Sequence, residues 1–350
     1  MGWLQRHIRP EQVRELSLLL LIVVAIVIFG SLIDGYYTSR TFNRVASSVA
    51  IIAVIAVGQT LVVLTRNIDL SVGSIVGCTA YFAGSLLAAD HGLSPGVVVL
   101  IAVLLGAGMG VINGLLVTLG RVPSIIVTLG SLAIYRGILV ELSGARTVTT
   151  DSLPAWLLDL PRLNLFSLGG LDIRAMIVLA LAIVVVFQLA TSYLTFGRHF
   201  YAIGSNPDAA QLIGMPVRRV VFAAFVLSGA LAGLAGFMTL ARFGNITVEN
   251  GRGLELQVVA AVVVGGVNIF GGSGTVMGAM LGAIMIGTLE QSLFRLQISE
   301  FWRDALLGLL ILLAVSSDAV ILQRLRALWA RTELKLVAKP PPAAGGGGSS

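Results

Sequence analysis

The chain has 350 residues, of which 57% are hydrophobic and 11% are charged, and its formal net charge is +6. A soluble globular chain carries roughly 25% charged residues, so this composition excludes that class and indicates an integral membrane protein. The single cysteine, Cys78, excludes an internal disulfide and a metal site built from thiolates. Neither lysine, Lys335 or Lys339, follows a glycine-rich phosphate loop, so we expect no catalytic site, no ATPase site and no cofactor in this chain.

The first apolar run begins after Arg14 and covers residues 16–29. No small-x-small cleavage site follows it and Ile33 extends it to spanning length, so we predict an uncleaved first helix. Further apolar stretches lie at about 45–64, 70–89, 96–119, 122–143, 174–194, 217–241, 256–268, 275–293 and 304–322. We therefore predict an all-α polytopic membrane protein with about ten transmembrane or re-entrant helices in a single domain over residues 16–322. The stretch near residue 256 is short enough to be re-entrant.

The basic residues predict the orientation, because membrane proteins keep an excess of arginine and lysine on the cytoplasmic side. If the N-terminus is cytoplasmic and all ten stretches cross, thirteen basic residues lie inside and nine outside. The outer nine are Arg40, Arg44, Arg146, Arg162, Arg174, Arg242, Arg252, Arg295 and Arg303. Both termini are then cytoplasmic, as an N-terminal segment (1–15) and a tail (323–350), and so is the segment 195–219. Residues 340–350 are interpreted as a flexible tail or an expression linker.

The longest polar interruption, residues 143–173, is predicted to be extracytoplasmic. It contains Pro154, Trp156 and Pro161, which favour a folded loop. Two interpretations stay open: a docking surface for a soluble protein, or a plain connecting loop.

The other long polar interruption, residues 195–219, carries the start signals of a short helix. Gly204 and Ser205 are expected to loosen the chain before it. Asn206 can cap the first free N–H groups, Pro207 suits the first turn, and Asp208 complements the helix dipole.

The end of this predicted helix is marked by Gly214 and Pro216. Its expected apolar face consists of Ala209, Ala210, Leu212 and Ile213. Because a helix of about two turns is marginally stable alone, we expect it to dock on a partner. An ordinary surface loop is the alternative.

Small residues recur at four-residue spacing, which allows membrane helices to approach closely. The sets are Gly106, Gly110 and Gly114; Gly229 and Gly233; and Gly274, Gly278 and Gly282. The glycines near residue 274 imitate a dinucleotide-binding fingerprint, but no predicted strand precedes them, so we favour helix packing.

Several motifs together resemble one family. The run GRHFYAIGSNPDAAQLIGM (197–215) is similar to the cytoplasmic coupling loop of the permease subunits of ribose-type sugar ABC importers. Matching motifs elsewhere are NIDLSVGS (67–74), INGLLV (112–117), RVPSIIVTLG (121–130), YRG (135–137), LSG and LAG (227–233), and VVGG, GG and GT (263–275). Their order and spacing hold over roughly residues 45–322.

The resemblance implies a membrane subunit that imports a monosaccharide across the bacterial inner membrane while a separate subunit hydrolyses ATP. The implied partners are that ATPase subunit, an extracytoplasmic sugar-binding protein, a second permease copy and membrane lipid; no nucleic acid is expected. The residues expected to contact the ATPase are Gly204, Asn206, Pro207, Asp208, Ala209, Ala210 and Gly214. The resemblance does not specify which sugar is carried, or whether the permease pair is a homodimer or a heterodimer.

Polar residues within the apolar stretches are candidates for the translocation pathway, because such groups are costly in a bilayer and face a cavity or a partner. The chosen set is Asn113, Thr128, Arg136, Glu255 and Asn268. Each could instead form a hydrogen bond between helices. Asp69 is expected at a cytoplasmic helix end, where solvation or capping suffices.

A possible inverted internal repeat supports a transporter. Residues 68–70 and 254–256 each place an acidic residue at the start of an apolar segment, and the two segments would enter from opposite sides. Four alternatives stay open: a non-sugar solute such as a signalling molecule, a purine nucleoside or a branched-chain amino acid; an ion-coupled secondary carrier; a membrane enzyme; and a purely structural membrane protein, which would not need the polar docking helix. An ion-coupled carrier should have two acidic side chains paired deep within the membrane. The enzyme should show a cluster of histidine, cysteine or carboxylate side chains.

Overall fold

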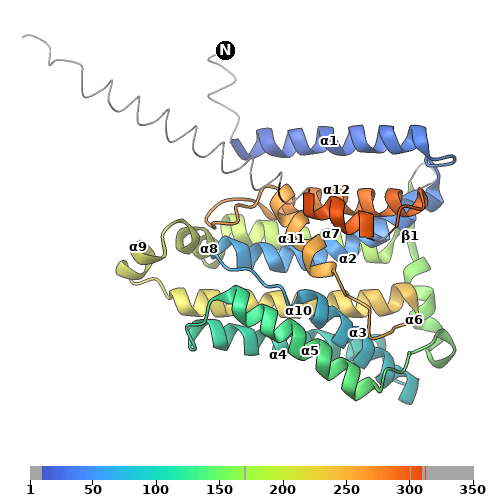
Figure 1. Cartoon of the computed structure of the whole chain (residues 1–350), viewed down its shortest axis with the longest axis horizontal. Coiled ribbons are helices and arrows are strands. Elements are labelled where there is room, and N and C mark those ends of the chain that lie inside the picture. Colours follow the sequence, from blue (N-terminus) through green and yellow to red (C-terminus); the bar gives the residue numbers. More distant parts are fainter. Residues whose placement is uncertain (1–9, 169–170, 300, 310–311, 313–350) are drawn as a thin grey trace, which may run out of the picture. The chain divides into compact units, whose positions relative to one another are not determined.

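Eight helices of the computed structural model are long and apolar enough to cross a membrane. They are α1 (Pro10–Leu32), α2 (Ser39–Leu64), α3 (Val72–Ala89), α4 (Pro95–Thr118), α5 (Ser124–Ser143), α7 (Ala175–Tyr193), α10 (Val217–Phe243) and α12 (Val276–Arg295). The apolar helix α11 (Leu254–Val264) is shorter. The polytopic all-α prediction is confirmed, and each of the first nine predicted apolar stretches overlaps one of these nine helices (Figure 1).

The structure describes residues 10–168, 171–299, 301–309 and 312. The chain forms two units, residues 1–311 and 312–350, and the described residues belong almost entirely to the first. The predicted stretch 304–322 is helical as far as residue 309. Apart from residue 312, the remainder of this stretch and the predicted tail lie outside the described residues.

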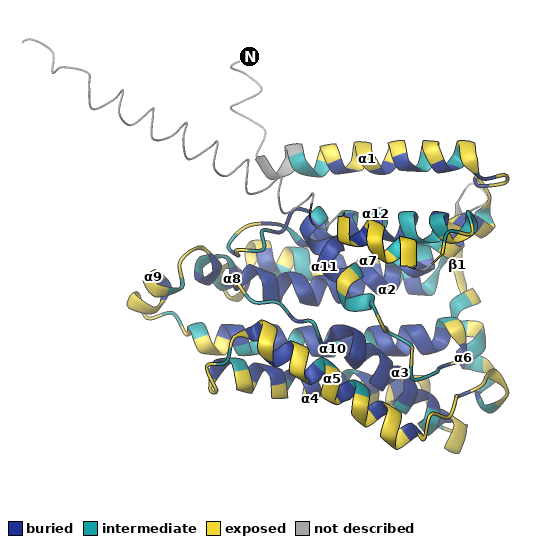
Figure 2. Ribbon diagram, viewed as in Figure 1, coloured by how far each residue is buried: buried dark blue, intermediate teal, exposed yellow. Residues whose placement is uncertain are grey.

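The core lies along α2, which is buried over nearly its whole length, and along α10 (Figure 2). Large apolar side chains on α1, α4, α5 and α7 are exposed, as expected of surfaces that face lipid. The glycine spacing allows the predicted close packing. A Cβ atom added at Gly106 of α4 would lie 2.2 Å from the carbonyl oxygen of Gly229 on α10, and one added at Gly278 of α12 would lie 2.2 Å from that of Gly265.

The packing also follows the predicted internal repeat. Helix α10 packs on α3 and α4, α2 packs on α11 and α12, and α2 and α10 contact each other. The two halves of the repeat therefore correspond, with α2, α3 and α4 of the first half matching α10, α11 and α12 of the second. In each half, the shorter helix and the one after it pack on the long helix of the other half. Helices α2 and α10 run in opposite directions, as an inverted repeat requires (Figure 1). A non-helical segment precedes each of the shorter helices, residues 65–71 before α3 and residues 244–253 before α11. We call these two non-helical segments, each of which joins two helices, the breaks.

The interruption 143–173 is folded rather than a plain connection. It contains η2 (Thr150–Ser152), α6 (Ala155–Asp159), η3 (Leu160–Arg162) and an antiparallel hairpin of β1 (Asn164–Leu168) and β2 (Leu171–Arg174). Leu153 and Leu157 are buried and anchor it to the bundle. Asn164 and Ser167 hold the pKa of the Asp172 carboxyl below its usual value through side-chain hydrogen bonds.

Candidate coupling site and buried polar groups

The segment 195–219 contains two helices, α8 (Thr195–Ser205) and α9 (Pro207–Leu212). The predicted cap of α9 is confirmed, because Asn206 Oδ1 accepts a hydrogen bond from the N–H of Ala209 at 3.0 Å. Pro207 and Asp208 occupy the first turn, and Gly214 has a φ of +79° just after the helix. The short helix therefore forms as its sequence signals predict.

The exposed apolar surface of α9 differs from the prediction. Leu212 is 88% exposed and Ile213 73%, and Ala209 is also exposed. Ala210 is only 3% exposed, since its methyl group packs against the chain itself. The prediction that Ala210 faces a partner is wrong in this structure, because one side of so short a helix must anchor it to the bundle.

The residues before α9 were also predicted incorrectly. Gly204 and Ser205 do not loosen the chain but form the last turn of α8. Gly204 is buried where α8 crosses the end of α2, and a Cβ atom there would lie 1.8 Å from the carbonyl oxygen of Leu64 and 2.3 Å from the N atom of Gly272. Only glycine permits this approach.

Two hydrogen bonds lie at the base of this segment: one joins the loop 265–275 to the end of α2, and the other joins it to α8. The N–H of Gly272 donates to the carbonyl oxygen of Leu64 at 3.1 Å, and the hydroxyl of Tyr201 donates to the carbonyl oxygen of Gly274 at 3.0 Å. The side chain of Arg66 donates to the carbonyl oxygens of Gly204 and Ser205, so α8 contacts the segment 65–71 through Arg66 and the loop 265–275 through Tyr201. A displacement of α8 would act on both halves of the internal repeat.

Asp69 is the centre of a buried polar cluster. Its side chain is fully buried; Oδ1 accepts from the N–H and hydroxyl of Ser71 at 3.0 and 2.6 Å, and Oδ2 accepts from the hydroxyl of Ser228 at 3.1 Å. In the amide orientation that satisfies both groups, Gln59 pairs with the backbone N–H and C=O of Asp69. The expectation that solvent surrounds Asp69 is wrong, although its bonds to Ser71 do cap the start of α3.

Two predicted pathway residues join this cluster. Asn113 Nδ2 donates to Ser71 Oγ at 2.8 Å, and the hydroxyl of Tyr135 lies 3.4 Å from Asn113 Oδ1. Thr128 Oγ1 donates to the carbonyl oxygen of Ser124 at 2.8 Å and lies 3.3 Å from that of Ile68. Side chains of α2, α4, α5 and α10 thus converge on the break between α2 and α3.

Arg136 and Glu255 form a second group at the other break. Arg136 Nη1 donates to the carbonyl oxygens of Val248 and Asn250 at 2.5 and 2.9 Å. Glu255 lies so close to Gly73 of α3 that a Cβ atom there would be 2.2 Å from Glu255 Oε2.

Asn268 is separate from both groups. Its Oδ1 accepts from the N–H of Phe270 at 2.9 Å and its own N–H donates to the carbonyl oxygen of Ser273, so it stabilises a turn in the loop 265–275. The five candidates therefore do not form a single site.

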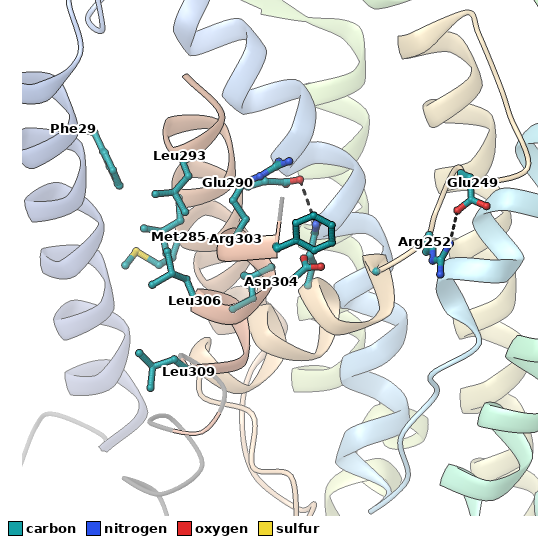
Figure 3. A pocket seen from close by; sticks show the side chains of 15 residues that line it. Phe29, Glu249, Arg252, Met285, Glu290, Leu293, Arg303, Asp304, Leu306 and Leu309 are labelled. Atoms are coloured by element: carbon teal, nitrogen blue, oxygen red, sulfur yellow. Dashed lines mark hydrogen bonds and ion pairs between the residues drawn. The ribbon is translucent and has the colours of Figure 1, made fainter. Parts of the chain in front are cut away.

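A cavity of about 860 Å³ opens between α1, α12, residues 249–257 and residues 301–309 (Figure 3). One wall is apolar, with Phe29, Met285 and Leu293. The lining also contains polar side chains, among which Gln257 Nε2 donates to Glu290 Oε1 at 3.2 Å. The volume falls in the range of small-molecule sites, about 300–1,000 Å³.

The Arg252–Glu249 pair lines the same cavity. Arg252 Nη1 contacts Glu249 Oε2 at 2.8 Å. This hydrogen bond holds the pKa of the Glu249 carboxyl below its usual value. No group of three or more histidine, cysteine or carboxylate side chains that could hold a metal ion occurs among the residues described.

Sequence reasoning missed Gln59, Ser71, Tyr135 and Ser228 as members of the cluster. A signal was available, because Asp69-Leu70-Ser71 has the spacing of a side chain that caps its own following backbone. Ser228 lies in the motif LSG, which the resemblance had marked without assigning a role. Its distance from Asp69, 159 positions, explains why no local pattern links the two.

Comparison with known proteins gives a consistent result. The model of the family described as "Branched-chain amino acid transport system / permease component" matches residues 41–315. The autoinducer 2 import system permease protein LsrC of Yersinia enterocolitica is 38% identical over 299 residues, which cover 85% of this chain and 81% of that protein. The protein of the same name from Yersinia pseudotuberculosis is 38% identical over 300 residues, which cover 85% and 83%. No solved structure matches the chain.

Proposed function

The chain belongs to the permease-component family of branched-chain amino acid transport systems, the membrane subunits of ATP-binding-cassette importers, and we propose that it carries a small, uncharged, hydroxyl-rich solute. The first candidate is a monosaccharide. The second is autoinducer 2, favoured by the names of the two Yersinia relatives.

One observation carries the preference for an uncharged solute. Two charged groups at the breaks are engaged inside the chain: Asp69 accepts from Ser71 and Ser228, and Arg136 donates to two backbone carbonyl groups. A charged amino acid would require free groups of opposite charge, because an unpaired charge in a low-dielectric pathway is costly. An uncharged sugar needs only hydroxyl and amide groups as hydrogen-bond partners. Such weak binding also allows the sugar to leave the pathway.

We assign the coupling role to α8 and α9. Leu212 and Ile213 would enter a groove of the ATPase subunit, while the hairpin of β1 and β2 and helix α6 would face the binding protein on the opposite side. A second permease copy would complete the assembly. The carrier alternative is disfavoured by membership of a family powered by ATP.

The orientation can be tested with reporters. A reporter fused after Leu212 should behave as cytoplasmic, and one placed near Trp156 as extracytoplasmic. The reverse result would remove both the orientation and the coupling assignment.

Transport itself requires reconstitution in vesicles. We expect the chain alone neither to hydrolyse ATP nor to accumulate solute, and addition of the ATPase and binding protein to restore both activities. Uptake driven by an ion gradient without the ATPase would contradict the proposal. The solute is best identified by thermal shift of the binding protein with pentoses, hexoses, polyols, nucleosides and autoinducer 2. A micromolar ligand at millimolar concentration should stabilise it by about 4 kcal/mol.

A further inference from the structure

Five of the nine arginines predicted to lie outside line one cavity of about 630 Å³. They are Arg40, Arg44, Arg162, Arg174 and Arg242. They come from the start of α2, from η3, from the residue before α7 and from the end of α10, so the fold gathers them from distant parts of the sequence. The cavity lies at the end of the bundle that carries α6 and β1 (Figure 1) and shares no lining residue with the cavity of Figure 3.

The charge of this cavity, which we call the arginine cavity, is strongly unbalanced. Asp159 is the only carboxylate among its lining residues. Within the described part of the chain, none of the five guanidinium groups forms an ion pair or donates a hydrogen bond. Arg242 is attracted by the carboxylate of Glu290, which does not line the cavity, and is repelled more weakly by Arg44. The positive end of the α2 dipole adds to the same potential. An anion would relieve this repulsion, and the arginine fork matches the oxygen atoms of a phosphate group.

A second observation also indicates a ligand. Asn43 lines the arginine cavity and is only 3% exposed. Its Nδ2 donates to Ser39 Oγ at 3.3 Å, whereas its buried Oδ1 receives no hydrogen bond from the described residues. A buried carbonyl oxygen is costly without a donor, so the site lacks a hydroxyl or N–H group beside the anion.

We propose that the arginine cavity binds a phosphate ester that also carries a hydroxyl group. The guanidinium groups would bind the phosphate oxygen atoms, and Asn43 Oδ1 would accept the hydroxyl proton. Two sources share this chemistry: the glycerol headgroup of an anionic phospholipid in the outer leaflet, and a soluble glycerol or sugar phosphate. Because Arg44 and Arg242 belong to α2 and α10, the bound ester would join the two long helices that the internal repeat exchanges.

The test uses the full-length chain in detergent, with bound lipid measured by native mass spectrometry. The probes are phosphatidylglycerol, phosphatidylmethanol, which has the same charge without the hydroxyls, and zwitterionic phosphatidylcholine. We expect phosphatidylglycerol to be retained at least fivefold more strongly than either of the others. The variant R44Q/R174Q should lose this preference. The variant R146Q, which removes an outer arginine that does not line the cavity, should keep it.

Glycerol phosphate, tested by competition and by thermal shift, distinguishes the two sources. Displacement of lipid, or a shift in the parent that R44Q/R174Q abolishes, would assign the site to a soluble ester. Comparison of the three lipids in the parent does not depend on the variants folding. Equal retention of all three lipids, together with no effect of glycerol phosphate, would overturn the proposal. The proposal would also be overturned if R44Q/R174Q weakened docking of the binding protein and left lipid retention unchanged.

Discussion

The guanidinium group of Arg66 donates from Nε to the carbonyl oxygen of Gly204 at 2.5 Å, which joins the break after α2 to the last turn of α8. Its Nη2 also donates to the carbonyl oxygen of Ser205 at 2.7 Å. Arg66 thereby satisfies carbonyl groups that a helix end leaves free. It stands three positions before Asp69, so one short segment connects the candidate coupling site to the buried polar cluster.

Replacing Arg66 with alanine should weaken coupling. Two hydrogen bonds to a charged donor would be lost, each contributing up to about 1.5–3 kcal/mol, less where the side chain is solvated. We expect solute-stimulated ATP hydrolysis by the assembled importer to fall at least fivefold while the permease remains inserted. The variant R121A is a matched control, because Arg66 and Arg121 both have a left-handed backbone, with φ values of 63° and 56°. Equal losses in the two variants would mean that backbone strain, and not the link to α8, is responsible.

Gly204→Ala should destabilise the folded protein. The added methyl group would collide with backbone atoms of Leu64 and Gly272, which cannot move aside as a flexible side chain can. Overpacking of this kind costs about 1–3 kcal/mol. Thermal unfolding in detergent should show a lower midpoint. Gly130→Ala on α5, where nothing lies within 4 Å of the added atom, should be neutral or stabilising by up to about 1 kcal/mol. A midpoint for Gly204→Ala equal to that of the parent would contradict the close approach of α8 to α2.

The helices and the cap of α9 could be predicted because their signals are local. Apolar runs of spanning length indicate membrane helices, and Asn206-Pro207-Asp208 has the composition of a helix start whatever surrounds it. Gly204 was misinterpreted for the opposite reason. Glycine is needed at position 204 because α8 approaches Leu64, a residue far away in the sequence. A local pattern cannot show this contact, and it suggests only that the glycine makes the chain flexible.

Burial of polar residues was the least predictable feature. The sequence predicts Asp69 at a cytoplasmic helix end where solvation or capping suffices, yet Ser228 and Gln59 enclose it from other helices. Asn113 and Thr128 were chosen for lying in apolar runs, and that criterion did find the cluster. The same criterion chose Asn268, which lies in a turn between helices. Apolar surroundings in the sequence therefore indicate burial without identifying the cavity that a side chain faces.

Ser228→Ala should lower the stability of the folded protein, because Ser228 donates a hydrogen bond to the buried Asp69 side chain. The change removes the donor at Oδ2, and a buried carboxylate that loses a hydrogen bond is destabilised by about 1–3 kcal/mol. Thermal unfolding should report the loss. Ser74→Ala is the control, because Ser74 is equally buried but its hydroxyl bonds only to the carbonyl oxygen of Ser71 within the same turn. If the two variants unfold at the same temperature, the Ser228–Asp69 hydrogen bond contributes nothing to stability.

Leu212→Glu tests whether α9 docks on the ATPase. In the permease alone, Leu212 is 88% exposed, so the substitution should change the free energy of unfolding by no more than about 0.5 kcal/mol. In a protein groove the same carboxylate would be buried without a partner, at a cost of several kcal/mol. We therefore expect normal insertion and an unchanged unfolding midpoint, with loss of ATPase co-purification and of solute-stimulated ATP hydrolysis.

Two companion variants separate docking from folding in this experiment. Gln211→Glu places the same charge on the adjacent exposed residue, and it should retain ATPase binding if Leu212 is the group that enters the groove. Ala210→Glu should instead lower the unfolding midpoint, because Ala210 is buried against its own chain. Retention of the ATPase and parental rates of ATP hydrolysis by Leu212→Glu would show that the exposed end of α9 is a solvated loop and that coupling occurs elsewhere in the chain.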